Sequence, residues 1–170
     1  MTGKEFSVLI ARIKEELDNI DILHQELKRN GIIKEGQNES VSVNLKDDTF
    51  ILRATASILH DFYVSVENIF KMICKELDES IPEGSDWHVQ LLKQVSMEIP
   101  GVRPRVISKK VMLDLDEYRG FRHVFRSVYG FNLSTKRLKD LLANFPTVLT
   151  TLEKDLEVFV KLLQKIMGKH

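Results

Sequence analysis

The sequence is poor in cysteine, tryptophan and proline, and neither sign of charge is in excess. Its 170 residues include one cysteine, one tryptophan and four prolines, and 25 Lys and Arg residues balance 25 Asp and Glu residues. A single cysteine excludes a disulfide framework, and the apolar neighbours of Cys74 predict a buried thiol. Zero net charge excludes a global attraction to nucleic acid, so any site for a polyanion must be local.

Long apolar runs and cofactor motifs are also missing. No stretch approaches the roughly 18 apolar residues of a membrane-spanning helix, and the N-terminal segment lacks the uninterrupted apolar core of a signal peptide. The five histidines show no metal-ligand spacing, and neither a glycine-rich phosphate loop nor a nucleophile elbow occurs. We therefore expect a cytoplasmic protein with no metal, no cofactor and no membrane contact.

Apolar residues recur with helical period along most of the chain. This period predicts helices over about residues 3–29, 47–80, 86–97 and 109–129, and a further helical region that begins at Ser134. Within the last region, Pro146 predicts either a kink or a break with Asn144 as a new N-cap. We therefore predict a single domain, residues 1–170, of the all-α class: a bundle of five or six helices.

Two segments depart from the helical pattern. Residues 31–45 form the one long irregular stretch, and a short strand over residues 40–44 would find no partner strand in this chain. Residues 99–106 contain Pro100 and Pro104, and each proline biases the residue before it away from helix. This second segment is therefore predicted to be a turn followed by extended chain.

One helical segment concentrates positive charge. Its basic side chains, which we call the cationic cluster, are Arg119, Arg122, His123 and Arg126. At about 100° per residue, these four side chains occupy roughly a third of the helix circumference. Crowded like charges repel one another, so the cluster predicts a bound anion, a carboxylate partner or open water. Removing one of these charges is expected to stabilise the protein or leave its stability unchanged.

An alternative interpretation makes the cluster structural. Arg122 falls inside the apolar stripe of its own helix, which is also typical of a buried arginine paired with a carboxylate from another helix. Asp116 precedes Arg119 by three residues and lies at pairing distance. Elsewhere, the sequence predicts a surface pair between His60 and Asp61. It also predicts that Trp87 seals one edge of the core.

Three segments of the sequence carry a family resemblance. They are Arg122-His123-Val124-Phe125-Arg126-Ser127-Val128-Tyr129, Trp87-His88 and Pro100-Gly101-Val102-Arg103-Pro104. Together they resemble the HEPN superfamily, and more narrowly the HepT-like ribonuclease toxins. The resemblance covers roughly residues 47–145, which an N-terminal helix and loop (1–46) precede and a C-terminal helix (146–170) follows. It implies a HEPN-type helical bundle that forms a dimer.

The resemblance implies metal-independent cleavage of RNA. In the family, a motif histidine moves the 2′-OH proton or protonates the leaving oxygen, and an arginine stabilises the charge of the transition state. Ser127 stands where the family has this histidine, and a serine hydroxyl does not titrate near pH 7. Losing such a group typically costs about 10²–10⁴-fold in rate.

Arg119 and His123 share a helix face, so they offer a displaced arginine–histidine pair. The predicted catalytic residues are therefore Arg122, His123, Arg119 and Tyr129. The predicted residues for binding RNA or another anion are Arg126 and Ser127.

Two functional hypotheses follow from the resemblance. The first is a toxin-type RNA endonuclease of a toxin–antitoxin pair, acting as a homodimer. Its antitoxin would be a nucleotidyltransferase that modifies the motif tyrosine, here Tyr129. The alternative is a catalytically inactive HEPN-type module that binds RNA, a nucleotide or a protein partner. A bundle whose helix seams serve only assembly is a third reading, and a test of RNA cleavage separates the first reading from the others.

Overall fold

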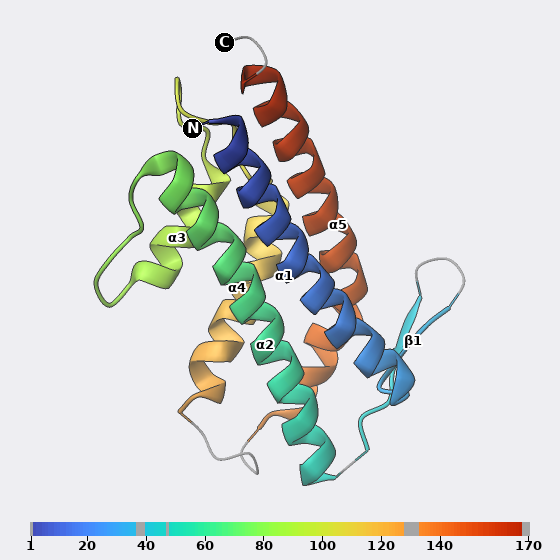
Figure 1. Cartoon of the computed structure of the whole chain (residues 1–170). Coiled ribbons are helices and arrows are strands. Elements are labelled where there is room, and N and C mark those ends of the chain that lie inside the picture. Colours follow the sequence, from blue (N-terminus) through green and yellow to red (C-terminus); the bar gives the residue numbers. More distant parts are fainter. Residues whose placement is uncertain (1, 37–39, 47, 128–132, 168–170) are drawn as a thin grey trace.

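The computed structural model describes residues 2–36, 40–46, 48–127 and 133–167. Helices contain 75% of them, which confirms the all-α prediction. The helical elements are α1 (Gly3–Arg29), α2 (Thr49–Ile73), the π-helical turn η2 (Cys74–Asp78), α3 (Trp87–Ser96), α4 (Lys109–Phe125) and α5 (Thr135–Met167). Helix α1 lies beside α2 and α5 in Figure 1, and α2 contacts all four other α-helices. Helix α2 is therefore the centre of the bundle.

Helix α1 has the boundaries that the sequence predicts. The Thr2 side chain accepts a hydrogen bond from the backbone of Glu5, and the Glu5 carboxylate accepts one from the backbone N–H of Thr2, which is a complete capping box. The helix ends at Asn30, and Gly31 follows with φ +67°, a conformation that glycine adopts without steric cost. The residues that begin and end this helix lie within a few positions of its ends, so the sequence alone predicts its boundaries.

Residues 31–45 contain a small hairpin that the sequence analysis did not predict. Strand β1 (Ile33–Glu35) pairs antiparallel with β2 (Val41–Val43), with Ile33 opposite Val43. The prediction that a strand over 40–44 lacks a partner is therefore wrong. Strand β1 has only three residues, too few to show an alternating pattern. The hairpin forms because β2 also packs against α5, a contact from far along the chain.

Helix α2 begins after Asp48, whose carboxylate accepts hydrogen bonds from the backbone N–H groups of Phe50 and Ile51. The predicted helix over 47–80 is divided in the structure. Its α-helical part ends at Ile73, η2 continues the coil, and Glu79 ends it with φ +53°. Cys74 is buried as predicted, and burial raises the pKa of its thiol to about 12.

Helix α4 packs against α2 and α5 and also contacts α3. The Ser108 side chain caps α4 by accepting from the backbone of Val111, and the backbone N–H of Ser108 donates to Asp155 of α5 at 2.7 Å. The predicted helix over 109–129 is described only to Phe125, with a turn to residue 127. Gly130 follows the predicted helix and is a residue type at which helices often end, but it lies outside the described residues.

Three rings from three helices meet in the core beneath α4. Phe62 of α2 makes edge contacts with Tyr118 of α4 and Phe145 of α5, with ring centroids 5.1 and 5.0 Å apart. The buried Tyr118 hydroxyl donates to the carbonyl of Leu141 at 2.8 Å, so its polar end is satisfied. This contact fixes one face of α4 toward the core and leaves its neighbouring face for the cationic cluster.

Helix α5 runs without a break through Pro146. The predicted break with Asn144 as a new N-cap is therefore wrong. A proline inside a helix costs about 3 kcal/mol. On either side of Pro146, buried Phe145 and Leu149 pack into the core. Burying such a side chain contributes about 1.5–3 kcal/mol, so the packing of the whole helix outweighs the local penalty.

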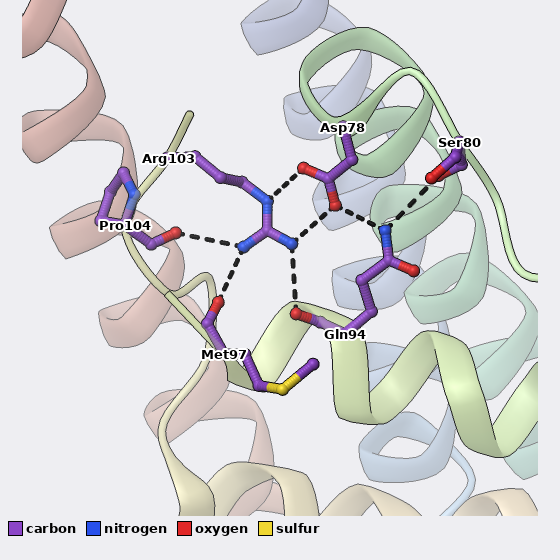
Figure 2. A network of polar contacts seen from close by, with 6 residues as sticks. All are labelled: Asp78, Ser80, Gln94, Met97, Arg103 and Pro104. Carbon is purple, nitrogen blue, oxygen red and sulfur yellow. Dashed lines mark hydrogen bonds and ion pairs between the residues drawn. The ribbon is translucent and has the colours of Figure 1, made fainter. Parts of the chain in front are cut away.

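The loop between α3 and α4 is held by a buried arginine, shown in Figure 2. Arg103 binds the Asp78 carboxylate with two hydrogen bonds of 2.6 and 2.8 Å, and its remaining N–H groups donate to the carbonyls of Met97, Pro104 and Gln94. All five guanidinium donors are therefore used. The Gln94 amide also donates to Asp78 at 2.6 Å. The sequence analysis identified the segment that contains Arg103 but not this role.

Candidate functional site

The cationic cluster lines a small cavity together with a histidine from α3. The five lining residues are His88, Arg119, Arg122, His123 and Arg126, and the cavity volume is about 30 Å³. The predicted sharing of one helix face is therefore confirmed. A space of this size holds about one water molecule or one oxygen atom of a larger anion. The site thus presents five basic side chains around room for a single oxygen.

A buried carboxylate lies beneath the cluster. Glu67 of α2 has only 2% of its side chain exposed, and its two oxygens bind Arg122 and His88. The alternative interpretation of Arg122, a buried arginine paired with a carboxylate from another helix, is confirmed. Sequence reasoning missed Glu67, although a signal existed. Glu67 falls between Tyr63 and Phe70 at helical spacing, on a face of α2 that is otherwise apolar.

The contact with Glu67 determines which nitrogen of His88 bears a proton. Nδ1 lies 2.5 Å from Oε1 of Glu67, and a carboxylate oxygen only accepts, so Nδ1 is the donor. Nη1 of Arg122 also lies 3.4 Å from Nδ1. Both groups are then donors, so this second approach is a close contact and not a hydrogen bond.

The remaining charges of the cluster are only partly balanced. Arg119 pairs with Asp116 at 2.6 Å, as predicted, while Asp114 pairs with Lys110 instead. Among the described residues, Arg126 and His123 form no ion pair, and Nε of Arg122 is buried without an acceptor. Arg126 and His123 line the cavity, whereas Nε of Arg122 is buried away from solvent. The arrangement is therefore suited to an anion from outside the chain.

Ser127 does not line the cavity. Its hydroxyl donates to the carbonyls of His123 and Val124 at 3.2 and 3.0 Å, in the turn that follows α4. Its predicted role in binding an anion is not supported by these contacts, because the donor is already used by the backbone. Tyr129, predicted to be catalytic, lies outside the described residues.

His60 lies at the edge of the site. It contacts the Phe125 ring at 5.5 Å between centroids, and its Nδ1 is buried with no hydrogen-bond partner among the described residues. No ion pair joins it to the exposed Asp61 in the described structure, so the predicted surface pair is wrong. Burial lowers the pKa of the His60 imidazole, and the positive charges of Arg122 and Arg126 lower this pKa further.

The lowered pKa of His60 predicts a dependence of stability on pH. The unfolded chain binds this proton near the ordinary histidine pKa of 6.5, and the folded state binds it only at lower pH. The unfolded state therefore holds more protons just below pH 6.5, so folding stability falls as the pH drops through this range. His60→Leu should show a smaller fall in melting temperature between about pH 8 and about pH 5.5 than the wild type. Equal falls in the two proteins would contradict this assignment.

Trp87 packs at the core edge, as predicted, and also fixes the ring of His88. The two ring centroids are 3.5 Å apart at an interplanar angle of 31°, and Nζ of Lys71 lies 4.2 Å from the centroid of the Trp87 ring. His88 is thus bound by Glu67 at Nδ1 and packed against an indole. Its imidazole has little freedom to rotate.

No group of three or more His, Cys, Asp or Glu side chains among the described residues is arranged to hold a metal ion. Across the same described ranges, no helix has both the length and the apolar character to cross a membrane.

Comparison with known proteins identifies a family. A protein-family model described as HepT-like protein matches residues 54–163, from the first turns of α2 to the last turns of α5. No curated protein and no solved structure matches the chain. The matched region includes Glu67, His88 and the whole cationic cluster.

Proposed function

Because the chain belongs to the HepT-like protein family, we propose that it is a toxin-type ribonuclease that binds and cleaves RNA at the cavity between α3 and α4. The observation that supports this function is the set of five basic side chains around that cavity, two of which are histidines. Guanidinium groups bind phosphate oxygens with charge-assisted hydrogen bonds, and imidazoles transfer protons near neutral pH. Both requirements of metal-independent RNA cleavage are therefore present in one place.

The residues divide the work according to their burial. Arg126 is exposed and unpaired within the described structure, so it is free to bind the RNA backbone. Arg119 shares its charge with a half-exposed Asp116 that a phosphate can displace. Arg122 is held by Glu67, and its positive charge beside the cavity is suited to stabilise the negative charge that develops on the phosphoryl oxygens. His123 and Tyr129 are the further catalytic residues that we propose on the family pattern.

The proposed partners are a second copy of the chain and an antitoxin. A homodimer that joins two cationic clusters would form a longer groove for RNA. The apolar seams of α1 and α5 do not support this dimer, because Ile13, Ile20 and Leu156 are buried within the chain itself. The proposed dimer rests on family membership. A nucleotidyltransferase-type antitoxin that modifies Tyr129 is the second proposed partner.

The second candidate function is binding of RNA, a nucleotide or a protein partner without cleavage. It is favoured by Ser127, whose hydroxyl bonds to backbone carbonyls at the position where the family has a histidine. Without another proton-transfer group, the cavity would bind a phosphate and leave its ester bonds intact.

A cleavage assay separates the two functions. The purified protein is incubated in EDTA with a mixed-sequence oligoribonucleotide, a transfer-RNA pool and an oligodeoxyribonucleotide of the same sequence. The proposed function predicts that both RNAs are cut and that the DNA stays intact, because only RNA has the 2′-OH nucleophile. Binding of RNA with no cleavage would favour the second function, and no binding would contradict both.

The role of Arg126 is tested by the affinity for RNA. Arg126→Gln should weaken binding and reduce the slope of log affinity against log salt concentration by about 1, since one phosphate contact is lost. Arg12→Gln is the matched control, because Arg12 is equally exposed but lines a different pocket, on α1. Fluorescence anisotropy with a labelled oligoribonucleotide measures the affinity and its salt dependence for each variant. Equal salt slopes for the two variants would place RNA elsewhere on the surface.

A further inference from the structure

We propose that His88 is the general base of the cleavage reaction. It would do the work of the family's motif histidine, whose position in this chain is occupied by Ser127. The proposal rests on the proposed ribonuclease function. His88 comes from α3, outside the helix that carries the cationic cluster, yet it lines the same cavity as Arg119, Arg122 and Arg126. A proton-transfer group and the phosphate-binding groups are thus brought together by tertiary packing.

The geometry around His88 orients one nitrogen for catalysis. Nδ1 donates to the buried Glu67 carboxylate, which leaves Nε2 as the unprotonated nitrogen of the neutral ring. No described residue makes a hydrogen bond to Nε2, and the side chain is 24% exposed. A base needs a free lone pair that substrate can reach. Nε2 has the free lone pair, and the partly exposed His88 side chain lines the cavity where substrate would bind. The carboxylate–imidazole contact also fixes the tautomer and stabilises the imidazolium that forms.

The other described histidines lack part of this arrangement. His123 lines the cavity, but no carboxylate among the described residues orients it. Burial and nearby arginines disfavour the charged form of His60. His24 has a carboxylate partner, Glu35, at 2.6 Å, but the pair lies at the β-hairpin end of α1 and not at the cavity. His88 alone among these histidines joins a carboxylate partner to a place in the cavity.

The proposed step balances without a metal or an external reagent. Nε2 of His88 accepts the proton of the ribose 2′-OH while the 2′ oxygen forms a bond to phosphorus. The bond from phosphorus to the 5′ oxygen breaks, and that oxygen takes a proton from water. The products are a 2′,3′-cyclic phosphate and a 5′-hydroxyl end, and His88 releases its proton to solvent. Arg122 and Arg126 stabilise the negative charge on the phosphoryl oxygens.

The test compares two histidine–glutamate pairs of the same chain. His88→Asn retains an N–H donor close to the position of Nδ1, so the contact with Glu67 survives while Nε2 is lost. We expect its single-turnover rate of RNA cleavage to fall by about 10²–10⁴-fold, with the affinity for RNA nearly unchanged. His24→Gln is the matched control and should cleave at the wild-type rate. If His88→Asn does not fold, His88→Ala with added imidazole supplies the measurement.

A rescue experiment separates catalysis from a structural role. His88→Ala leaves room for a free imidazole, and added imidazole should restore part of the lost rate without changing the affinity for RNA. Wild-type cleavage by His88→Asn would overturn the proposal and leave the ribonuclease function standing. Loss of cleavage in His123→Asn with retention in His88→Asn would assign the base to His123 instead. A wild-type protein that cleaves no RNA would remove the proposed function and this proposal together.

Discussion

Replacing Arg103 with methionine should lower the free energy of unfolding by about 3–5 kcal/mol, the usual cost of breaking a buried ion pair. The Arg103 side chain is 0% exposed and the Asp78 side chain 3%. Arg103→Met therefore leaves a buried carboxylate that keeps the Gln94 amide as a donor but has lost its positive partner. It also leaves the carbonyls of Met97 and Pro104 without the guanidinium donors that they now accept from. Chemical denaturation followed by circular dichroism measures the change.

Arg105→Met is the matched control for this substitution. Arg105 lies two residues further along the same loop and is exposed, so its replacement should change stability by less than about 0.5 kcal/mol. Adding Asp78→Leu to Arg103→Met should recover part of the loss, because removing both charges avoids an unpaired buried ion. If Arg103→Met proves as stable as Arg105→Met, the network in Figure 2 does not hold the loop in solution.

Arg122→Ala should destabilise the protein by about 2–4 kcal/mol, somewhat less than a fully broken buried pair because His88 still binds Glu67. This expectation reverses the first interpretation of the sequence, in which the charges of the cluster repel one another, and agrees with the alternative, in which Arg122 is paired with a carboxylate. The reversal follows from Glu67, whose carboxylate is almost fully buried and needs a positive partner. Thermal and chemical denaturation both measure it.

Arg126→Ala is the comparison for the cluster. Arg126 is exposed and has no ion-pair partner among the described residues, so the sequence-based expectation still applies to it: equal or slightly higher stability. A loss of stability in Arg122→Ala, with equal or higher stability in Arg126→Ala, would show that Arg122 is structural and Arg126 is free. If Arg122→Ala matched Arg126→Ala in stability, the pair with Glu67 would be too weak to shape the site.

The helices were predictable because their signals are local. Thr2 and Ser108 cap helices through contacts three residues away, and a helical period marks the buried faces. The hairpin and the unbroken course of α5 were not predictable in this way. Both depend on contacts between β2, α5 and the core that join distant parts of the chain. Local rules for strand pairing and for proline fail where such contacts outweigh them.

The candidate site also has one part that the sequence predicts from local spacing and one part that depends on distant contacts. The shared face of Arg119, Arg122, His123 and Arg126 follows from spacing along one helix. The carboxylate that neutralises Arg122 lies 55 residues earlier in the chain, and His88 lies 34 residues before Arg122. A sequence shows that an arginine in an apolar stripe needs a partner, but only the fold selects which carboxylate supplies it.

Helix α3 illustrates how the bundle limits motion at the cavity. It has ten residues, fewer than the roughly 12–15 that an isolated helix needs to be even marginally stable in water. Its first turn is tied to α2 through His88 and Glu67, and its last turn to η2 and the following loop through Gln94, Asp78 and Arg103. Helix α3 therefore cannot open at one end alone without breaking a buried polar contact. Under the proposed function, a phosphate oxygen that enters the cavity meets a rigid wall on the α3 side. Adjustment to the rest of the substrate then falls to the exposed side chains of α4.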